Sequence, residues 1–226
     1  MAFVVAIDGP AGAGKGTITK LVGEKLNLIN IDTGAMYRCV SLYMIRNNID
    51  LDNIEKIEEM LSKIKIEQRK NEEGIDEFYL EGENVSFEIR KDPVNNIVSP
   101  VSHIPIVREK MVELQRKIAL EKDVIMEGRD IGTNVFPNAD VKIYLDATAE
   151  ERANRRLKQN MEKGITSSYE EILKGIIVRD NNDKTSNVAP LKQAEDAIYV
   201  DSTELNIEEV TQKIIEIINK VREKND

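Results

Sequence analysis

Among its 226 residues the chain has only one cysteine and one histidine, and it has no tryptophan. A single cysteine, Cys39, excludes an intramolecular disulfide and a cysteine-rich metal cluster. Ser–His or Cys–His chemistry would depend on His103, which the sequence places in an extended stretch before Pro105. We therefore expect structural roles for Cys39 and His103.

Long apolar runs are also missing. No stretch of about 18 consecutive apolar residues occurs, which is the length that a membrane-spanning helix needs. The short apolar run near the N-terminus has no basic region before it and is interrupted by Asp8, unlike a secretion signal. Together with the single cysteine, these absences predict a cytoplasmic protein with no membrane partner.

The chain has fewer basic than acidic residues. Its 32 Lys and Arg residues and 41 Asp and Glu residues give a net charge of −9. A nucleic-acid backbone would repel such a chain at long range, so we expect no nucleic-acid partner. Any phosphate site must therefore gather basic side chains locally. The length suits one large domain, or a core with an inserted subdomain, that needs no disulfide.

The most informative segment is residues 9–17, which read Gly-Pro-Ala-Gly-Ala-Gly-Lys-Gly-Thr. A short, β-branched run at residues 3–7 precedes it, and apolar residues at helical spacing follow from Ile18 to Leu26. The sequence thus predicts a buried strand, a glycine-rich loop and a helix N-terminus, which bind phosphate through backbone N–H groups. The predicted nucleotide-binding residues are Gly9, Pro10, Ala11, Gly12, Ala13, Gly14, Lys15, Gly16 and Thr17.

This loop departs at one position from the pattern G-x-x-x-x-G-K-[ST], because Gly16 follows Lys15 and the hydroxyl comes one residue later, at Thr17. Lys15 is expected to supply a mobile charge for the β- and γ-phosphates. Gly-Lys-Gly-Thr resembles the loop of nucleoside monophosphate kinases more than that of regulatory GTPases. A nucleotide-switch protein would also carry an Asn-Lys-x-Asp motif, which the sequence lacks.

Further short apolar runs read as strands that end in turns near acidic residues, at residues 28–31, 123–128, 141–146 and 197–202. Helical patterns separate most of them, as in a parallel sheet. In such sheets ligands bind beyond the carboxyl ends of the strands. Thr33, Arg38, Arg129 and Asp130 all fall just after such an end.

Amphipathic patterns predict the helices. They cover about residues 52–64, a long helix from Pro105, a helix opened by the capping box 148–151, another over 168–179, and a last helix capped by Asn206 and Glu209. Arg108 falls in the first turn of its helix, where the dipole disfavours a cation unless an anion is near. Residues 92–102 give no clear assignment. Residues 66–90 are charged and turn-rich, and the turn at 81–84 predicts a hairpin in a small inserted antiparallel sheet.

Together these motifs resemble bacterial cytidylate kinases over nearly the whole chain. The P-loop is shared by many kinases, whereas the other motifs are together quite specific. They are residues 32–38 (Asp-Thr-Gly-Ala-Met-Tyr-Arg), 80–90 (Glu-Gly-x-x-Val with Ile-Arg), 127–130 (Glu-Gly-Arg-Asp), 179–183 (Arg-Asp-x-x-Asp) and 188–191 (Val-Ala-Pro-Leu).

The resemblance implies an α/β fold with a P-loop, a doubly wound five-stranded parallel sheet with helices on both faces, an inserted small antiparallel β subdomain and a helical lid. It implies one kinase domain over residues 1–226, with a monophosphate-binding insert at about 65–102 and a lid at about 150–168. The implied reaction is transfer of the γ-phosphoryl group of ATP to CMP or dCMP, with Mg²⁺. We expect a monomer.

The resemblance also implies roles for single residues. Thr33, Arg108 and Asp130 match positions that read the cytosine, and Arg38 and Arg129 match those that hold the acceptor phosphate. Ser99, Arg179 and Asp183 match sugar-facing positions, and Tyr37 belongs to the same substrate set. Arg155 and Arg156 match lid arginines that reach the ATP phosphates. The expected catalytic residues are Lys15, Arg129, Arg155 and Arg156.

One position departs from the family pattern, because Ser186 stands where an arginine usually follows the sugar-binding Asp183 by three residues. An arginine would offer a forked, charged donor to the acceptor phosphate, whereas serine offers one neutral hydroxyl. Weaker clamping of the acceptor phosphate is expected, unless Lys184 takes over the contact.

These residue types suit phosphoryl transfer. The acceptor monophosphate is already largely a dianion near neutral pH, so no general base is needed, and the barrier lies in charge and positioning. A closing lid would exclude water. For Mg²⁺ we expect Thr17 and water as ligands, with Asp32 a weaker candidate. The motifs leave two alternatives open: a kinase for another monophosphate such as UMP or AMP, and a non-enzymatic nucleotide-binding protein.

Overall fold

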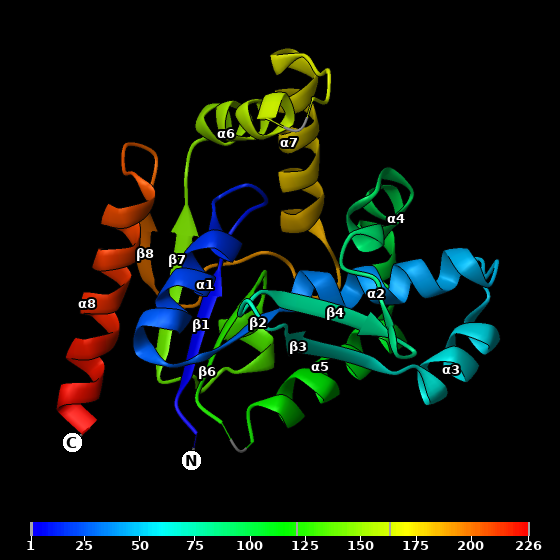
Figure 1. The fold of residues 1–226 in the computed structure, drawn as a ribbon, viewed down its shortest axis with the longest axis horizontal. Helices are drawn as coiled ribbons and strands as arrows, with labels where there is room; N and C mark the ends of the chain where they lie inside the picture. The colour runs from blue at the N-terminus through cyan, green and yellow to red at the C-terminus, as the bar shows by residue number, and fades with distance from the viewer. Residues whose placement is uncertain (1, 121, 163, 226) are drawn as a thin grey trace. The chain divides into compact units, whose positions relative to one another are not determined.

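The computed structural model describes residues 2–120, 122–162 and 164–225 (Figure 1). The chain divides into two compact units, which we call the core unit (Met1–Asn30 with Ala119–Asp226) and the inserted unit (Ile31–Ile118). Residue 163 of the expected lid, and residues 1, 121 and 226 of the expected domain, lie outside the described residues.

The main sheet has five strands in the order β2-β6-β1-β7-β8. β1 pairs in parallel with β6 and β7, and β7 pairs in parallel with β8. All five residues of β1 are buried, as expected of a central strand in a sheet covered on both faces. The strands are β1 (Val4–Asp8), β2 (Ile29–Asp32), β6 (Val124–Gly128), β7 (Val141–Asp146) and β8 (Ile198–Asp201).

Two helices of the core unit pack on one face of this sheet. They are α1 (Lys15–Leu26) and α8 (Ile207–Asn225), which lie side by side in Figure 1. The apolar face of α8 repeats at Val210, Ile214 and Ile218, and each of these side chains is buried against strand residues such as Ile7 and Val200. This core fixes the loop between β1 and α1 at the carboxyl edge of the sheet.

Helices α6 (Ala149–Glu162) and α7 (Tyr169–Thr185) pack against each other (Figure 1). Their starts confirm the predicted caps, since Glu151 donates its backbone N–H to the Thr148 hydroxyl and Glu171 donates to the Ser168 hydroxyl. Helix α7 continues to Thr185, beyond the predicted end at Arg179. A short π-helical turn, η2 (Ile131–Val135), follows β6.

The inserted unit combines four helices with a three-stranded antiparallel sheet, within the part of the chain that the structure describes. The predicted hairpin at residues 81–84 is confirmed. Arg46 donates hydrogen bonds to both Glu83 and Glu88, which ties the hairpin to α2. The elements are α2 (Thr33–Arg46), α3 (Ile54–Lys63), α4 (Asp92–Ser102), α5 (Pro105–Ile118), β3 (Ile66–Lys70), β4 (Asp76–Leu80), β5 (Glu83–Asn84) and the 3₁₀ turn η1 (Glu88–Arg90).

Helix α4 occupies the segment that the sequence analysis left unassigned. Pro93 lies in its first turn, where a missing N–H costs nothing, and Val94, Val98 and Val101 are buried at helical spacing. The placement of His103 in an extended stretch was wrong, because its backbone caps the C-terminus of α4. Cys39 is fully buried, and burial raises the pKa of its thiol to about 12.

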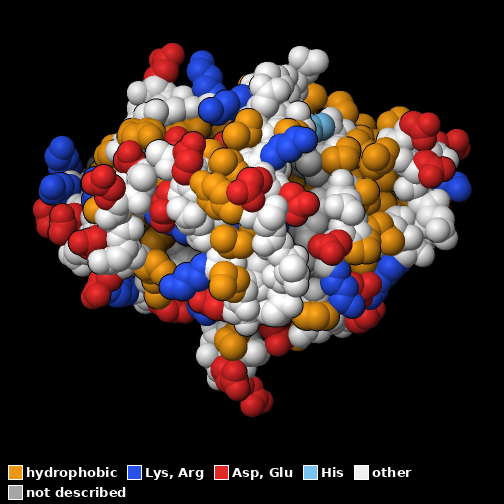
Figure 2. Space-filling view, turned by 90° about the horizontal axis from the view of Figure 1, so that it is seen from above, with side chains coloured by type: hydrophobic (Ala, Val, Ile, Leu, Met, Phe, Trp, Pro, Cys, Tyr) orange, Lys and Arg blue, Asp and Glu red, His pale blue; other side chains and the backbone are white. Residues whose placement is uncertain are grey.

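The predicted fold class, a P-loop α/β fold with an additional small antiparallel sheet, is confirmed. Among the helices of the described residues, none has both the length and the apolar character for crossing a membrane. On the face shown in Figure 2, acidic and basic side chains are interspersed with apolar ones, so the acidic excess of the composition is spread out there.

Candidate active site

The glycine-rich loop runs from the end of β1 into the first turn of α1, as the sequence predicted. Lys15 folds back over this loop, and its Nζ donates to the carbonyl oxygens of Gly9 and Pro10, at 2.8 Å each. The side chain is buried rather than extended into solvent, with 6 % of the residue exposed. In this state the loop itself holds the lysine in place beside the carboxyl ends of the strands.

One glycine of the loop, Gly9, is required by a close contact with backbone. A Cβ at Gly9 would lie 2.0 Å from the carbonyl oxygen of Leu145, and a Cβ at Gly16 would lie 2.9 Å from Oε1 of Glu127. Glu127 stands on β6, the neighbour of β1. The second contact is with the end of the flexible Glu127 side chain, which can move aside, so it does not by itself require glycine after Lys15.

The positive charges of two arginines act on Lys15. Burial lowers the pKa of its ammonium group, and the positive charges of Arg129 and Arg179 lower it further, while Glu127 and Asp8 act in the opposite direction. The carboxylates of Glu127, Asp8 and Asp183 balance part of this positive charge. A phosphate group bound by the loop would offset the remaining repulsion between the three cations.

Arg129 and Asp130, just beyond β6, are both held by neighbours. Arg129 donates from Nε to Oδ2 of Asp183 on α7 at 2.9 Å, so two of the predicted substrate-binding residues form an ion pair. Asp130 is buried, and Asn134 donates to its Oδ2 at 2.9 Å. The structure thereby brings Lys15, Arg129, Arg179 and Asp183 into one cluster of the core unit.

The arginines of α6 fall into different environments, although the sequence gives them similar neighbours. Arg152 is buried and donates to the Asp180 carboxylate, to the carbonyl of Ala147 and to the carbonyl of Ala11 in the P-loop. It therefore braces α6 against α7 and against the loop. Arg155 lines a cavity. Arg156 is exposed and is not among the residues that line that cavity.

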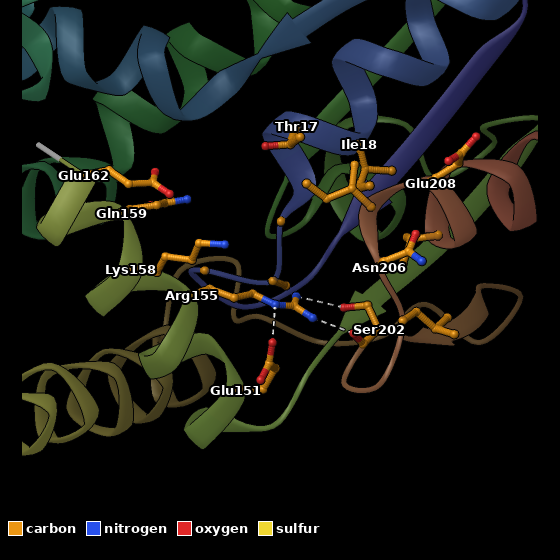
Figure 3. Close-up of a pocket in the computed structure, with 16 residues that line it drawn as sticks. Thr17, Ile18, Glu151, Arg155, Lys158, Gln159, Glu162, Ser202, Asn206 and Glu208 are labelled. Carbon is orange, nitrogen blue, oxygen red and sulfur yellow. Dashed lines mark hydrogen bonds and ion pairs between the residues drawn. The ribbon is translucent and has the colours of Figure 1, made fainter.

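The cavity has a volume of about 620 Å³ and lies within the core unit, beside the P-loop. Figure 3 shows its three walls: Thr17 and Ile18 from the start of α1, a row of side chains from α6, and the segment from Ser202 to the start of α8. The α6 wall consists of Glu151, Arg155, Lys158, Gln159 and Glu162. Ligand pockets commonly measure about 300–1,000 Å³, so the space suits a nucleoside.

The third wall was missed by the sequence analysis. Residues 202–210 had been interpreted only as a strand end and a helix cap, and that cap is confirmed, since Asn206 and Glu209 exchange hydrogen bonds. A usable signal existed, because β8 ends at the same edge of the sheet as β1, and loops at that edge gather around the ligand. Asn206 and Glu208 are among the residues of this wall that line the cavity (Figure 3).

In the inserted unit, helix α2 carries three predicted substrate residues, Thr33, Tyr37 and Arg38. Thr33 and Tyr37 are buried. Arg38 donates to the carbonyl of Ile89 at 3.0 Å and to the side-chain oxygen of Asn95 at 2.6 Å. Its guanidinium is therefore fixed by the 3₁₀ turn η1 and by α4.

Arg108 lies in the first turn of α5, as predicted, and is buried. Its guanidinium is 5.8 Å from the centroid of the Tyr37 ring and donates to the carbonyl of Ser102 at 3.3 Å. The carbonyl at the end of α4 supplies negative charge next to this cation. Ser99, also on α4, is half-buried. The inserted unit thus groups Arg108 with Tyr37 between α2, α4 and α5.

The two residues expected to bind Mg²⁺, Thr17 and Asp32, lie in different surroundings. Asp32 accepts the backbone N–H of Ala35 as the cap of α2, which gives it a structural role. Thr17 is exposed at the start of α1 and lines the cavity. No three His, Cys, Asp or Glu side chains gather in the described ranges to form a metal site.

Ser186, the departure from the family pattern, ends α7. Its hydroxyl donates to the carbonyl of Val188 at 2.8 Å and accepts the Val188 N–H at 3.1 Å. The side chain closes a local turn, and the residue is half-buried. Lys184 is exposed nearby.

Comparison with known proteins gives a consistent result over the whole chain. The model of the cytidylate kinase family matches residues 5–220. A cytidylate kinase from Fusobacterium nucleatum subsp. nucleatum is 49% identical over 220 residues, which cover 97% of this chain and 99% of that protein. A cytidylate kinase from Caldicellulosiruptor saccharolyticus is 52% identical over 217 residues, with 96% of each chain covered.

Among solved structures, a shikimate kinase from Bacteroides thetaiotaomicron has a TM-score of 0.50 at 17% identity, with 96% of this chain and 98% of that chain covered. An uncharacterised protein from Eubacterium ventriosum has a TM-score of 0.52 at 12% identity, with 96% and 98% covered. At these identities the likeness shows the fold alone. The family model and the near relatives carry the assignment: the chain belongs to the cytidylate kinase family, as the sequence motifs predicted.

Proposed function

We propose that this protein transfers the γ-phosphoryl group of ATP to CMP or dCMP, which yields ADP with CDP or dCDP. The observation that carries the proposal is the buried Lys15, which the Gly9 and Pro10 carbonyls of the P-loop hold within reach of the charges of Arg129 and Arg179. Phosphoryl transfer needs cations around two polyanions and needs no nucleophilic side chain. Membership in the cytidylate kinase family supports cytidine monophosphates as acceptors.

The donor is expected at the P-loop. Backbone N–H groups of residues 9–17 and the N-terminus of α1 would bind its phosphates, and the cavity beside Thr17 would take its nucleoside. Arg155, on the α6 wall, would contact the donor phosphates together with Arg156. Magnesium, held through the Thr17 hydroxyl, would neutralise phosphate charge when bound.

For the acceptor, the family motifs assign roles to residues of the core unit and, separately, to residues of the inserted unit. Arg38 and Arg129 would hold its phosphate, and Thr33, Arg108 and Asp130 would recognise the cytosine. Ser99, Arg179 and Asp183 would face the sugar, with Tyr37 beside Arg108. These roles rest on the family motifs. The ion pairs and hydrogen bonds described above support them, because they fix the side chains before a substrate arrives.

The proposal also covers the location of the protein, its oligomeric state, its insert and its lid. We expect a cytoplasmic monomer with residues of about 65–102 as the monophosphate-binding insert and residues of about 150–168 as the lid. Lid closure over the donor would exclude water, which would otherwise compete with the acceptor for the γ-phosphoryl group.

An ADP-release assay tests the function. Purified protein receives ATP, Mg²⁺ and one monophosphate at a time from a panel that includes CMP, dCMP, UMP, AMP and GMP. We expect CMP and dCMP to support the fastest release. A best rate with UMP or AMP would assign a different acceptor, and release that is independent of any monophosphate would reject a kinase of this class.

A further inference from the structure

Asp8 is a buried carboxylate in the core unit for which the proposed reaction has no direct use. It is the last residue of β1, directly before the P-loop, and 5 % of it is exposed. Its Oδ1 accepts the backbone N–H of Ile131 at 2.8 Å, and its Oδ2 accepts the N–H of Gly132 at 2.7 Å. These bonds join residues separated by more than half of the chain.

The two N–H groups belong to the first residues of the turn η2. The first N–H groups of any helical turn have no partner within the turn and need an acceptor from elsewhere. Asp130, directly before the turn, does not cap it with its side chain; its carboxylate instead accepts a hydrogen bond from Asn134. Asp8, at the end of β1, therefore caps η2 in place of Asp130. The Asp130 carboxylate binds Asn134 instead.

A carboxylate at the position of Asp8 carries two electrostatic costs. It lies close to Lys15 and to the loop expected to bind phosphate, where a negative charge disfavours an anion. Burial also penalises the charged form and raises the pKa of Asp8 to about 6, although the two backbone bonds oppose that effect. A neutral side chain would avoid both costs. The benefit must come from the two bonds, which fix the segment 129–132 to the start of the P-loop.

We propose that Asp8 is a positioning residue of the phosphoryl-transfer site, which holds Arg129 against the P-loop by capping the turn that follows it. The inference rests on the proposed role of Arg129 at the acceptor phosphate. Arg129 is anchored at one end by Asp183 and at the other by its own backbone, whose direction the Ile131 and Gly132 bonds fix. A small misplacement of such a cation costs on the order of 100-fold in rate.

The test is the substitution Asp8→Asn, which keeps the shape of the side chain. Its amide oxygen can accept one N–H, but its NH₂ group then faces the other N–H, so one of the two bonds is lost. At saturating ATP and CMP we expect kcat to fall by about 10- to 100-fold. The KM for ATP should change by less than about 2-fold, because the donor contacts remain.

A double-mutant cycle with Arg129→Ala separates positioning from a general structural effect. If Asp8 acts through Arg129, Asp8→Asn should lower kcat by less than about 3-fold once the arginine is absent. An equal loss with and without Arg129, or no loss in the wild-type background, would overturn the inference. Unchanged activity of Arg129→Ala alone would instead overturn the proposed role of Arg129.

Asp140→Asn is the matched control. Asp140 accepts the N–H of Val4 at the other end of the same strand β1, at 2.7 Å, far from the carboxyl edge. We expect wild-type kinetics from it. If Asp8→Asn fails to fold, Gly132→Ala provides a second route. The new Cβ would lie 3.1 Å from the Lys142 side chain and 3.4 Å from Asp8 Oδ2, so the turn and these side chains must shift by a few tenths of an ångström. This variant should show a smaller loss of kcat with the same dependence on Arg129, and losses that add to that of Arg129→Ala would again reject the inference.

Discussion

Arg155 donates hydrogen bonds to both the hydroxyl and the carbonyl oxygen of Ser202, and these bonds join helix α6 to the loop after β8 across the cavity (Figure 3). Its Nε also donates to Glu151, one turn earlier on the same helix. The guanidinium therefore stands at the wall of the proposed donor pocket in a defined direction before the nucleotide binds.

We expect Arg155→Ala to weaken the use of ATP more than the use of CMP. Loss of one preorganised charge contact to a reacting phosphate costs on the order of 100-fold, so kcat/KM for ATP should fall by about that factor. Initial-rate kinetics with each substrate varied in turn provide the measurement. Lys174→Ala removes an exposed cation from the packed helix α7 and should leave both constants unchanged.

Lys15→Met should abolish most phosphoryl transfer while the protein stays folded. The methionine fills much of the buried space but carries no charge, and we expect a loss of about 100-fold or more in kcat. Circular dichroism checks the fold, and coupled ADP release checks the rate. Lys20→Met, on the same helix α1, is the control. Near-normal turnover by Lys15→Met would remove the lysine from the mechanism.

Asp130→Ala should narrow the preference for CMP over AMP. A site built to hydrogen-bond one base edge is left with unpaired groups when another base enters, and such discrimination reaches ~10⁴-fold in favourable cases. The ratio of kcat/KM values for CMP and AMP is the readout. Asn134→Ala, which removes the partner of Asp130 but keeps the carboxylate, should change this ratio less. An unaltered ratio in Asp130→Ala would exclude the carboxylate from base recognition.

Ser186→Arg should tighten acceptor binding by roughly 10- to 100-fold, because hydrogen bonds to charged groups contribute about 1.5–3 kcal/mol. Part of this gain will be offset, since the substitution removes the turn that the Ser186 hydroxyl closes with Val188. The KM for CMP is measured. If it does not change, while Lys184→Ala raises it sharply, the lysine has taken over the contact. No effect of either substitution would show that this segment does not reach the acceptor phosphate.

The stability of the protein should depend on the protonation of Asp8. Burial raises its pKa from 3.8 to about 6, so the folded state binds the proton more tightly than the unfolded state. The stabilisation is complete below about pH 4 and is lost as pH rises through 6, amounting to about 3 kcal/mol. The free energy of unfolding of the wild type, relative to Asp8→Asn, should decrease by this order across that range, as measured by urea denaturation. A difference that is flat with pH would show that burial does not shift this carboxyl.

The sequence by itself determined the elements whose signals are local. The apolar run before Gly9, the helical spacing after it and the caps at Thr148, Ser168 and Asn206 all lie within a few residues of the groups that they organise. Backbone geometry and short-range hydrogen bonds decide such features, so they were predicted correctly. Helix α4 also carried a local signal in its valine spacing, but its two prolines obscured it.

The motifs likewise determined the family, which the family model confirms over residues 5–220. They could not separate Arg152 from Arg155, since both lie on the same charged helix and have similar neighbours in sequence. One turns inward to Asp180 and the P-loop, and the other faces the cavity. Which of the two arginines turns inward is decided only by the packing of α6 on α7.

The tertiary structure alone decided the contacts between distant residues. Asp8 meets Ile131 and Gly132 because parallel pairing of β1 with β6 brings Asp8 level with Gly128 at the carboxyl edge of the sheet. Ser202 reaches Arg155 because β8 ends at that same edge. Strand order and register create these contacts, and neither is encoded in the spacing of residues along one segment.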